Sequence, residues 1–186
     1  AISRIGNDEV QEHAARGQYS DGWMQGEKVP AYREEKDVAK DSNTETFAAV
    51  KFFIDNWRWQ GVPFYTRTGK HLHEKTTVLS IQFKPAPAYS FPKEAAETWR
   101  PNRLTISIAP EMDICLRFQA KRPGQAMILS PVDMVFNYKD EYDGEEPEAY
   151  ETLLYDVMEG DATLFMRADQ VEAAWEVVMP ILEVWA

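Results

Sequence analysis

The sequence predicts an α+β fold, with a large, mainly antiparallel sheet and helices packed on one of its faces. Two observations support this prediction. Apolar and polar residues alternate in several segments, as is typical of strands that bury a single face; these segments are 77–83, 104–108, 114–120 and 132–138. Other segments carry apolar residues at the spacing of an amphipathic helix, namely 44–58, 147–160 and 169–182.

The amino-terminal segment, residues 1–41, is polar and shows no sustained periodicity. Gly17, Gly22, Gly26 and Pro30 interrupt it, and such residues are typical of turns. We therefore expect an irregular segment that wraps over the rest of the domain. Residues 8–15 are compatible with a short helix within this segment.

The first long helix is predicted over residues 44–58. Ser42 and Glu45 have the S-x-x-E spacing of a capping box, which satisfies the free amides of a first helical turn. Apolar side chains then recur at helical spacing, at Phe47, Val50, Ile54 and Trp57. Gly61 and Pro63 mark the end of this helix.

About five strands are predicted after this helix. The first, 63–67, is short and aromatic. Two alternating runs flank a turn at 110–113, so they should form an antiparallel hairpin. A second turn at Pro123-Gly124 leads to the last strand, and the proline-bearing stretch 84–100 is a connection.

Two helices follow the strands. The acidic stretch 139–146 is expected to be a solvated loop. The next helix should begin with Pro147 in its first turn and end near Gly160. The last helix should begin near Asp169, and Pro180 should kink it.

The composition is that of a soluble globular protein, with 44% apolar and 27% charged residues. The formal charge of −11 argues against nucleic acid as a partner, because that binding needs clustered cations. No apolar run is long enough for a membrane helix, and no signal peptide is visible. The single cysteine, Cys115, fits a reducing cytoplasm and is expected to be packed in the sheet.

The motifs of common enzyme classes are missing: there is no glycine-rich dinucleotide fingerprint, P-loop, nucleophile elbow or cysteine pair. His71 and His73 would share a face of a strand, but no third ligand is evident nearby, so no metal site is expected. Asp156, Glu159 and Asp161 surround a helix end, where solvation or ion pairing is a simpler role than acid–base catalysis. No catalytic residue is assigned.

The segment 55–75, DNWRWQGVPFYTRTGKHLHEK, combines a dense aromatic run with a cationic turn. Its aromatic side chains are expected to anchor a core. Lys70 and Lys75 lie five residues apart and would bind one phosphate or sugar if the segment turned back on itself. Spacing alone favours the alternative of two solvated lysines, and Arg67 could equally serve in a structural ion pair.

An ordered set of motifs covers nearly the whole chain. The set includes SNTETFAAVKFFIDNWRWQGVPFYTRTGKHL (42–72), NRLTISIAP (102–110), SPVDMVFNY (130–138) and EAYETLLYDVMEGDATLFMRADQVEAAW (148–175). In these motifs, and in their order, the chain resembles the carboxyl-terminal domain of glucose-6-phosphate dehydrogenase.

The resemblance implies part of an oxidoreductase that converts glucose 6-phosphate to 6-phosphogluconolactone, with NADP as the hydride acceptor. In the family, the dinucleotide-binding Rossmann domain and the catalytic histidines precede this region. Residues 1–186 would then be the substrate-binding and dimerisation domain, inactive alone and without a cofactor of its own.

The resemblance also implies roles for two residues. The turn Arg67–Lys70 matches the substrate-binding lysine motif of the family, so Lys70 should contact the sugar phosphate. Lys75 matches the second basic contact. Both would bind and orient the substrate without transferring a proton.

The sequence departs from the family at several positions. Ala109 stands where many members carry a glutamine that helps the substrate site. Some animal enzymes hold a second, structural NADP through basic residues where this chain has Thr76, Ser80 and Ser107, so we expect no structural NADP here.

Two interpretations of the chain remain open. In the family, the large sheet forms the dimer interface, which implies a homo-oligomer. The alternative is a non-catalytic paralogue that kept the sheet for assembly or for sensing sugar phosphates. Ala109 favours that alternative, and the retained Lys70 and Lys75 argue against it.

Overall fold

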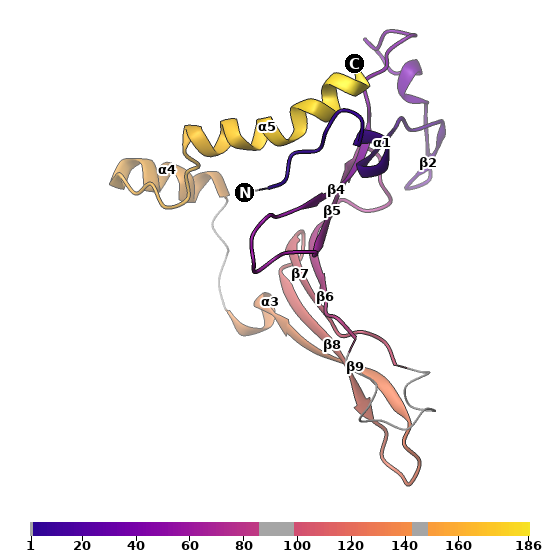
Figure 1. Cartoon of the computed structure of the whole chain (residues 1–186), viewed down its shortest axis with the longest axis vertical. Helices are drawn as coiled ribbons and strands as arrows, with labels where there is room; N and C mark the ends of the chain where they lie inside the picture. The colour runs from indigo at the N-terminus through magenta and orange to yellow at the C-terminus, as the bar shows by residue number, and fades with distance from the viewer. Residues whose placement is uncertain (1, 86–98, 143–148) are drawn as a thin grey trace. The chain divides into compact units, whose positions relative to one another are not determined.

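The computed structural model describes residues 2–85, 99–142 and 149–186. The chain divides into two compact units. Unit 1 comprises Ala1–His73 and Glu148–Ala186, and unit 2 comprises Glu74–Pro147. Both units contain helices and strands (Figure 1), and every strand pair among the described residues is antiparallel. The predicted α+β class is confirmed.

A three-stranded sheet of order β1-β4-β5 lies in unit 1 (Figure 1). Its strands are β1 (Ala14–Gly17), β4 (Phe47–Phe53) and β5 (Pro63–Gly69). The middle strand, β4, pairs along its whole length with β5, and its first four residues pair with β1. All seven of its residues are half-buried, so this strand supports both neighbours.

The prediction of a helix over residues 44–58 is wrong, because residues 47–53 form strand β4 and a turn follows it. The side-chain oxygen of the predicted capping residue Ser42 accepts the N–H of Thr44, at 3.3 Å, in a segment that is not helical. The aromatic and β-branched content of FAAVKFF also suits a strand, and neighbours on both edges satisfy its backbone groups. Because both faces are partly covered, the strand lacks the alternation that would have distinguished it from a helix.

The turn between β4 and β5 contains the residues that were expected to end a helix. The side-chain oxygen of Asn56 accepts the N–H of Trp59 at 2.9 Å, and the N–H of Val62 donates to the carbonyl of Trp59 at 3.0 Å. Gly61 has a φ of +72°, which glycine adopts without strain. Pro63 is the first residue of β5.

The aromatic run of this region anchors packing only in part. Phe64 stacks on Phe52, with ring centres 5.6 Å apart, and meets the edge of Trp59 at 5.5 Å. Trp57 is 89% exposed and Tyr65 is 75% exposed. The expectation of a core anchor is therefore wrong for these last two residues.

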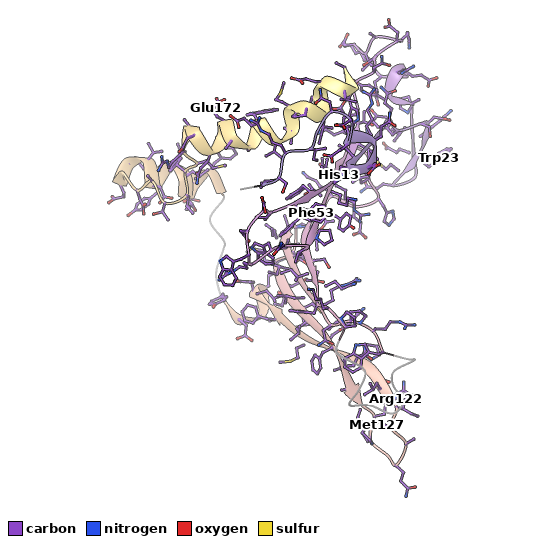
Figure 2. All side chains as sticks on the ribbon, in the orientation of Figure 1. His13, Trp23, Phe53, Arg122, Met127 and Glu172 are labelled. Atoms are coloured by element: carbon purple, nitrogen blue, oxygen red, sulfur yellow. The ribbon has the colours of Figure 1, made fainter. Side chains whose placement is uncertain are left out.

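The amino-terminal segment contains more regular structure than expected. Helix α1 (Val10–His13) lies within the predicted range 8–15, and η1 is a single 3-10 turn (Tyr32–Glu34). Strands β2 (Gly22–Met24) and β3 (Glu27–Val29) form a hairpin. Its two turn residues, Gln25 and Gly26, both have positive φ, as in a type I′ turn. Trp23 projects from this hairpin (Figure 2).

The core of unit 1 joins its amino-terminal segment to its last helix. Ile5, Val10 and Ile181 are buried together, and Val10 is entirely buried. Ile181 belongs to the last helix, α5 (Ala168–Trp185), so this helix packs on the amino-terminal segment. Partly buried apolar residues extend the cluster, among them Val50 of β4.

Polar contacts at the surface also link α5 to the amino-terminal segment. Arg4 pairs with Glu176 at 2.7 Å. The guanidinium of Arg16 lies 5.6 Å from the ring centre of Trp185 and donates to the carbonyl of the same residue. Because these groups are exposed, their contribution to stability is small beside that of the buried cluster.

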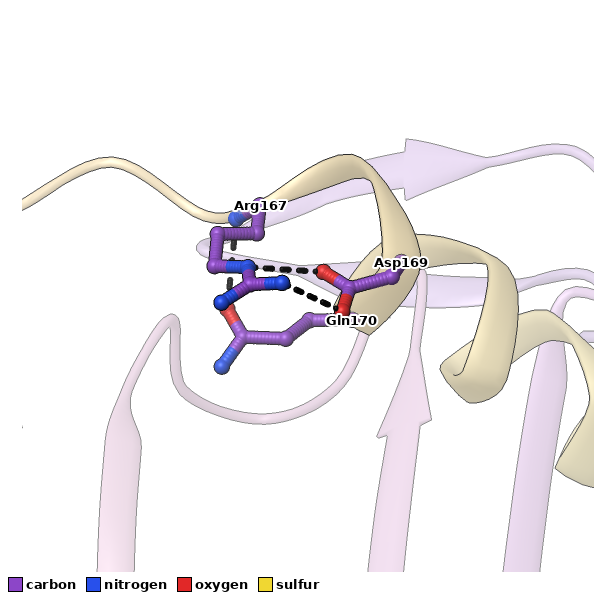
Figure 3. A network of polar contacts seen from close by, with 3 residues as sticks. All are labelled: Arg167, Asp169 and Gln170. Carbon is purple, nitrogen blue, oxygen red and sulfur yellow. Dashed lines mark hydrogen bonds and ion pairs between the residues drawn. The ribbon is translucent and has the colours of Figure 1, made fainter.

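The two carboxyl-terminal helices are close to their predicted positions. Helix α4 spans Ala149–Glu159; its expected start at Pro147 lies outside the described residues. Helix α5 begins at Ala168, where the N–H of Arg167 donates to Gln170 and its guanidinium forms a two-point ion pair with Asp169 (Figure 3). Pro180 lies within α5. None of the described helices is long and apolar enough to cross a membrane.

Unit 2 contains a four-stranded sheet of order β6-β7-β8-β9. Its elements are β6 (Thr77–Gln82), β7 (Arg103–Ala109), β8 (Asp113–Lys121), β9 (Leu129–Asn137) and helix α3 (Tyr138–Glu141). The predicted hairpin of β7 and β8 is present. The predicted turn at Pro123-Gly124 lies in a second hairpin, of β8 and β9, and Arg122 and Met127 lie in that turn (Figure 2).

Two expectations about unit 2 need adjustment. The predicted strands do not share one sheet, because the strand predicted over 63–67 pairs in the sheet of unit 1. The expected acidic loop 139–146 begins inside α3, and its remainder from residue 143 lies outside the described residues. Most of the predicted connection 84–100 also lies outside them.

The register of unit 2 separates the two faces of its sheet. The apolar face consists of paired aliphatic and aromatic side chains: Leu79, Ile81, Leu104, Ile106, Ile114, Leu116, Phe118, Val132, Met134 and Phe136. The opposite, polar face carries an ion pair across β8 and β9, in which Arg117 binds both carboxylate oxygens of Asp133 at 2.7 and 2.8 Å. The predicted alternation is thus confirmed.

The buried cluster of unit 1 predicts the effect of a core substitution. Val10→Ala should lower the free energy of unfolding by about 1–3 kcal/mol, because it removes apolar surface from a fully buried site. Chemical denaturation would measure this loss. The matched variant Val78→Ala, at a position 47% exposed, should change it by less than about 0.5 kcal/mol. Equal losses in the two variants would contradict the assigned core.

The ion pair on the polar face predicts how the pKa of Asp133 responds to mutation of Arg117. The hydrogen bond from Arg117 lowers the pKa of Asp133. A carboxyl group of lowered pKa stabilises the folded state above its unfolded pKa, and this contribution is lost as the pH falls through the folded pKa. Arg117→Gln should raise the pKa of Asp133 toward its ordinary value, as measured by NMR of the carboxyl carbon. Arg122→Gln should not move it, since Arg122 binds Ser130 instead.

Candidate functional site

Lys70 follows directly after β5 in unit 1. Its backbone N–H donates to the carbonyl of Thr46 at 2.8 Å, which continues the pairing of β4 and β5 beyond Phe47 and Gly69. Its side chain is exposed. No carboxylate in the described part of the chain forms an ion pair with it, so its ammonium group is available to an anion.

Gly69 precedes Lys70 at a point of close approach. A Cβ atom at this position would lie 3.2 Å from the carbonyl oxygen of Thr46 and 3.1 Å from the ring of Phe47. Both distances are shorter than ordinary contacts between carbon and its neighbours. The absence of a side chain at Gly69 therefore lets the end of β5 lie against the start of β4.

His71 follows Lys70 in the left-handed conformation, with a φ of +50°. Its ring meets the ring of Tyr19 edge to face, with centres 4.6 Å apart, and its Nδ1 lies 3.2 Å from the sulfur of Met24. This backbone conformation is unusual for a residue with a side chain. In this conformation the ring of His71 contacts both Tyr19 and Met24.

Thr46 connects this turn to the amino-terminal segment. It is only 8% exposed. Its hydroxyl accepts the N–H of Tyr19 at 3.0 Å and lies 3.5 Å from the carbonyl of Gly17, while its own N–H donates to that carbonyl at 2.9 Å. A buried polar residue with all of these groups paired holds its surroundings in one arrangement.

The environment of Tyr19 is partly buried and acidic. Burial raises the pKa of the Tyr19 hydroxyl, and the nearby carboxylate of Glu35 raises it further. The hydroxyl donates to Glu35 at 3.3 Å, and the ring of Tyr32 lies 5.8 Å away, edge to face. Tyr19 therefore remains neutral at physiological pH and serves in packing.

Lys75 belongs to unit 2, and one residue, Thr76, separates it from β6. Its side chain is exposed. The hydroxyl of the next residue, Thr76, donates to the carbonyl of Ala109 at 3.1 Å, and Thr77 pairs with Ala109 across the sheet. Lys75 and Ala109 thus lie at the same end of the β6–β7 pair.

The other candidates from the sequence have structural contacts. His71 lies in a turn rather than on a strand, and residues 2–85, 99–142 and 149–186 contain no group of three or more potential metal ligands. Asp161 accepts the N–H and the hydroxyl of Thr163, which lowers its pKa. The hydroxyl of Ser107 donates to Asp113 at 3.0 Å.

The sequence analysis missed the contribution of Tyr19, Thr46 and Gly69 to the surroundings of Lys70. The glycine directly before the lysine was a signal, since it permits close backbone approach. Tyr19 and Thr46 carried no comparable signal, because their contact joins segments 27 residues apart.

Comparisons with known proteins agree with the resemblance. The family model of the glucose-6-phosphate dehydrogenase C-terminal domain matches residues 1–186. Glucose-6-phosphate 1-dehydrogenase of Mycolicibacterium smegmatis is 46% identical over 185 residues, covering 100% of this chain and 37% of the relative. The Bacillus subtilis protein of the same name is 46% identical over 188 residues, covering 100% of this chain and 38% of that protein.

Solved structures are similar over almost the whole chain. A glucose-6-phosphate dehydrogenase in complex with its substrate glucose 6-phosphate has a TM-score of 0.85 and 35% identity, over 98% of this chain and 36% of that one. The enzyme from Mycobacterium avium has a TM-score of 0.73 and 32% identity, over 98% of this chain and 35% of that one.

The chain thus spans little more than a third of the length of these relatives. The family model covers every residue, and the comparisons of sequence and of structure lead to the same family. The chain belongs to the family of glucose-6-phosphate dehydrogenase C-terminal domains.

Proposed function

We propose that this chain is the substrate-binding and dimerisation part of a cytoplasmic glucose-6-phosphate dehydrogenase. The whole enzyme would oxidise glucose 6-phosphate to 6-phosphogluconolactone in the oxidative pentose phosphate pathway, with NADP as hydride acceptor. The match of the family model to all of residues 1–186 supports this proposal. The observation that carries it is the exposed ammonium of Lys70, which has no ion-pair partner among the described residues and directly follows the Arg-Thr-Gly end of β5.

The contribution of this chain to the reaction is binding and orientation. Lys70 would donate charge-assisted hydrogen bonds to the sugar phosphate, and these are stronger than bonds between neutral groups. Lys75 would supply the second basic contact. Holding the hexose in one orientation lowers the entropic cost of the hydride transfer. The hydride acceptor and the groups that take up the proton would come from the remainder of the enzyme.

The two lysines predict a kinetic effect in the full-length enzyme. Lys70→Ala and Lys75→Ala should each raise the KM for glucose 6-phosphate by about tenfold or more, since a charged hydrogen bond is worth about 1.5–3 kcal/mol. Steady-state kinetics at varied sugar phosphate would measure this.

Two controls accompany the lysine variants. Lys28→Ala, at an exposed position on the β2–β3 hairpin, should leave the KM unchanged. The chain of residues 1–186 by itself should reduce no NADP. Unchanged kinetics in both lysine variants would remove them from the substrate site, and activity of the isolated chain would refute its assignment as the non-catalytic part.

We further propose that the protein self-associates through the sheet of unit 2. Both faces of this sheet expose large apolar side chains: Met134 on the apolar face is 62% exposed and Val135 on the polar face is 65% exposed. Exposed apolar area of this kind typically marks an interface. These two neighbours on β9 provide a matched pair for testing the two faces.

Light scattering of the full-length protein should therefore report an oligomer. Met134→Glu and Val135→Glu each place a charge on one face of the sheet, and the charge should weaken association where that face is buried. The variant that shifts the mass toward the monomer identifies the face. A monomeric parent, or two variants with unchanged association, would contradict the proposal.

A further inference from the structure

The backbone on each side of Lys70 is held by contacts that the lysine side chain does not make. We name the residues that make them the Thr46 clamp: Tyr19, Met24, Thr46, Gly69 and His71. All of them belong to unit 1. They come from three separate stretches of the chain: the amino-terminal segment, the residue before β4, and the end of β5.

The first part of the clamp acts on the residues before and at Lys70. Gly69 lies so close to Thr46 that a Cβ atom would be 3.2 Å from the Thr46 carbonyl oxygen. That same oxygen accepts the N–H of Lys70 at 2.8 Å. Because Thr46 is nearly buried and its hydroxyl accepts the N–H of Tyr19, the acceptor of the Lys70 amide is itself fixed.

The second part of the clamp acts on the residue after Lys70. The left-handed His71 seats its ring against Tyr19 and beside the sulfur of Met24. Tyr19 therefore contacts both parts, with its backbone N–H on Thr46 and its ring on His71. The chain direction at Lys70 is determined from both sides, although Lys70 itself is exposed.

We propose that the Thr46 clamp positions Lys70 for binding the sugar phosphate, which makes Thr46 and Gly69 positioning residues for the substrate. This inference rests on the proposed role of Lys70. A lysine side chain has many rotamers, so a fixed backbone origin limits the region that its ammonium group samples. Displacing a binding group by about 1 Å can cost up to about a hundredfold in rate.

The main test is Gly69→Ala in the full-length enzyme. The added methyl group must push the end of β5 away from Thr46, so the KM for glucose 6-phosphate should rise about five- to tenfold while kcat and the KM for NADP stay within about twofold. Gly22→Ala is the matched control, since a Cβ atom at Gly22 meets nothing within 4 Å. It should leave all three constants unchanged.

A second variant covers the case in which Gly69→Ala does not fold. Thr46→Val removes the hydroxyl that binds the amide of Tyr19 but keeps the shape of the side chain, and it should raise the same KM about threefold or more. Thr46→Ser keeps the hydroxyl and should restore the KM to within about twofold of the parent.

A purely structural role would be recognised by a double-mutant cycle. If the clamp acts through Lys70, adding Gly69→Ala to Lys70→Ala should raise the KM no further, because the group that it positions is already absent. Additive effects would overturn the proposal, as would Gly69→Ala and Thr46→Val variants with parental KM.

These kinetic measurements distinguish a failure of the clamp proposal from a failure of the proposed function. An unchanged KM in Lys70→Ala would remove the proposed role of Lys70 itself. A raised KM in Lys70→Ala together with parental values in both clamp variants would leave that role intact and reject only the clamp.

Discussion

Strand β4 is the constraint on which unit 1 depends. Its first four residues pair with β1 on one edge, and its whole length pairs with β5 on the other. The amides and carbonyls of those four residues are therefore satisfied only when both neighbours are present. Val50 on the same strand packs against the buried cluster of Ile5, Val10 and Ile181. The strand thereby connects the amino-terminal segment, the last helix and the segment that ends at Lys70.

The candidate site follows from this arrangement. The register that pairs Phe47 with Gly69 brings Lys70 next to Thr46, one residue beyond the sheet. The buried hydroxyl of Thr46 then connects this point to Tyr19. An exposed cation on a supported backbone can meet an anion without first ordering the chain, which lowers the entropic cost of binding.

Much of the fold could be predicted from local patterns. The alternation of apolar and polar residues identified β6, β7, β8 and β9 because only one face of that sheet is strongly apolar. The same method failed for β4, where apolar spacing imitated a helix and both faces were half-buried. It also failed for the β2–β3 hairpin, whose strands are too short to show any periodicity.

The sequence by itself determined the family, the α+β class and the two candidate lysines, because an ordered set of motifs and local alternation survive without any knowledge of contacts. Only the tertiary structure decided that residues 47–53 form a strand and that Tyr19 and Thr46 support the backbone at Lys70. The reason is physical: strand pairing and buried hydrogen bonds join residues far apart in the chain, and no local spacing encodes which partners will satisfy them.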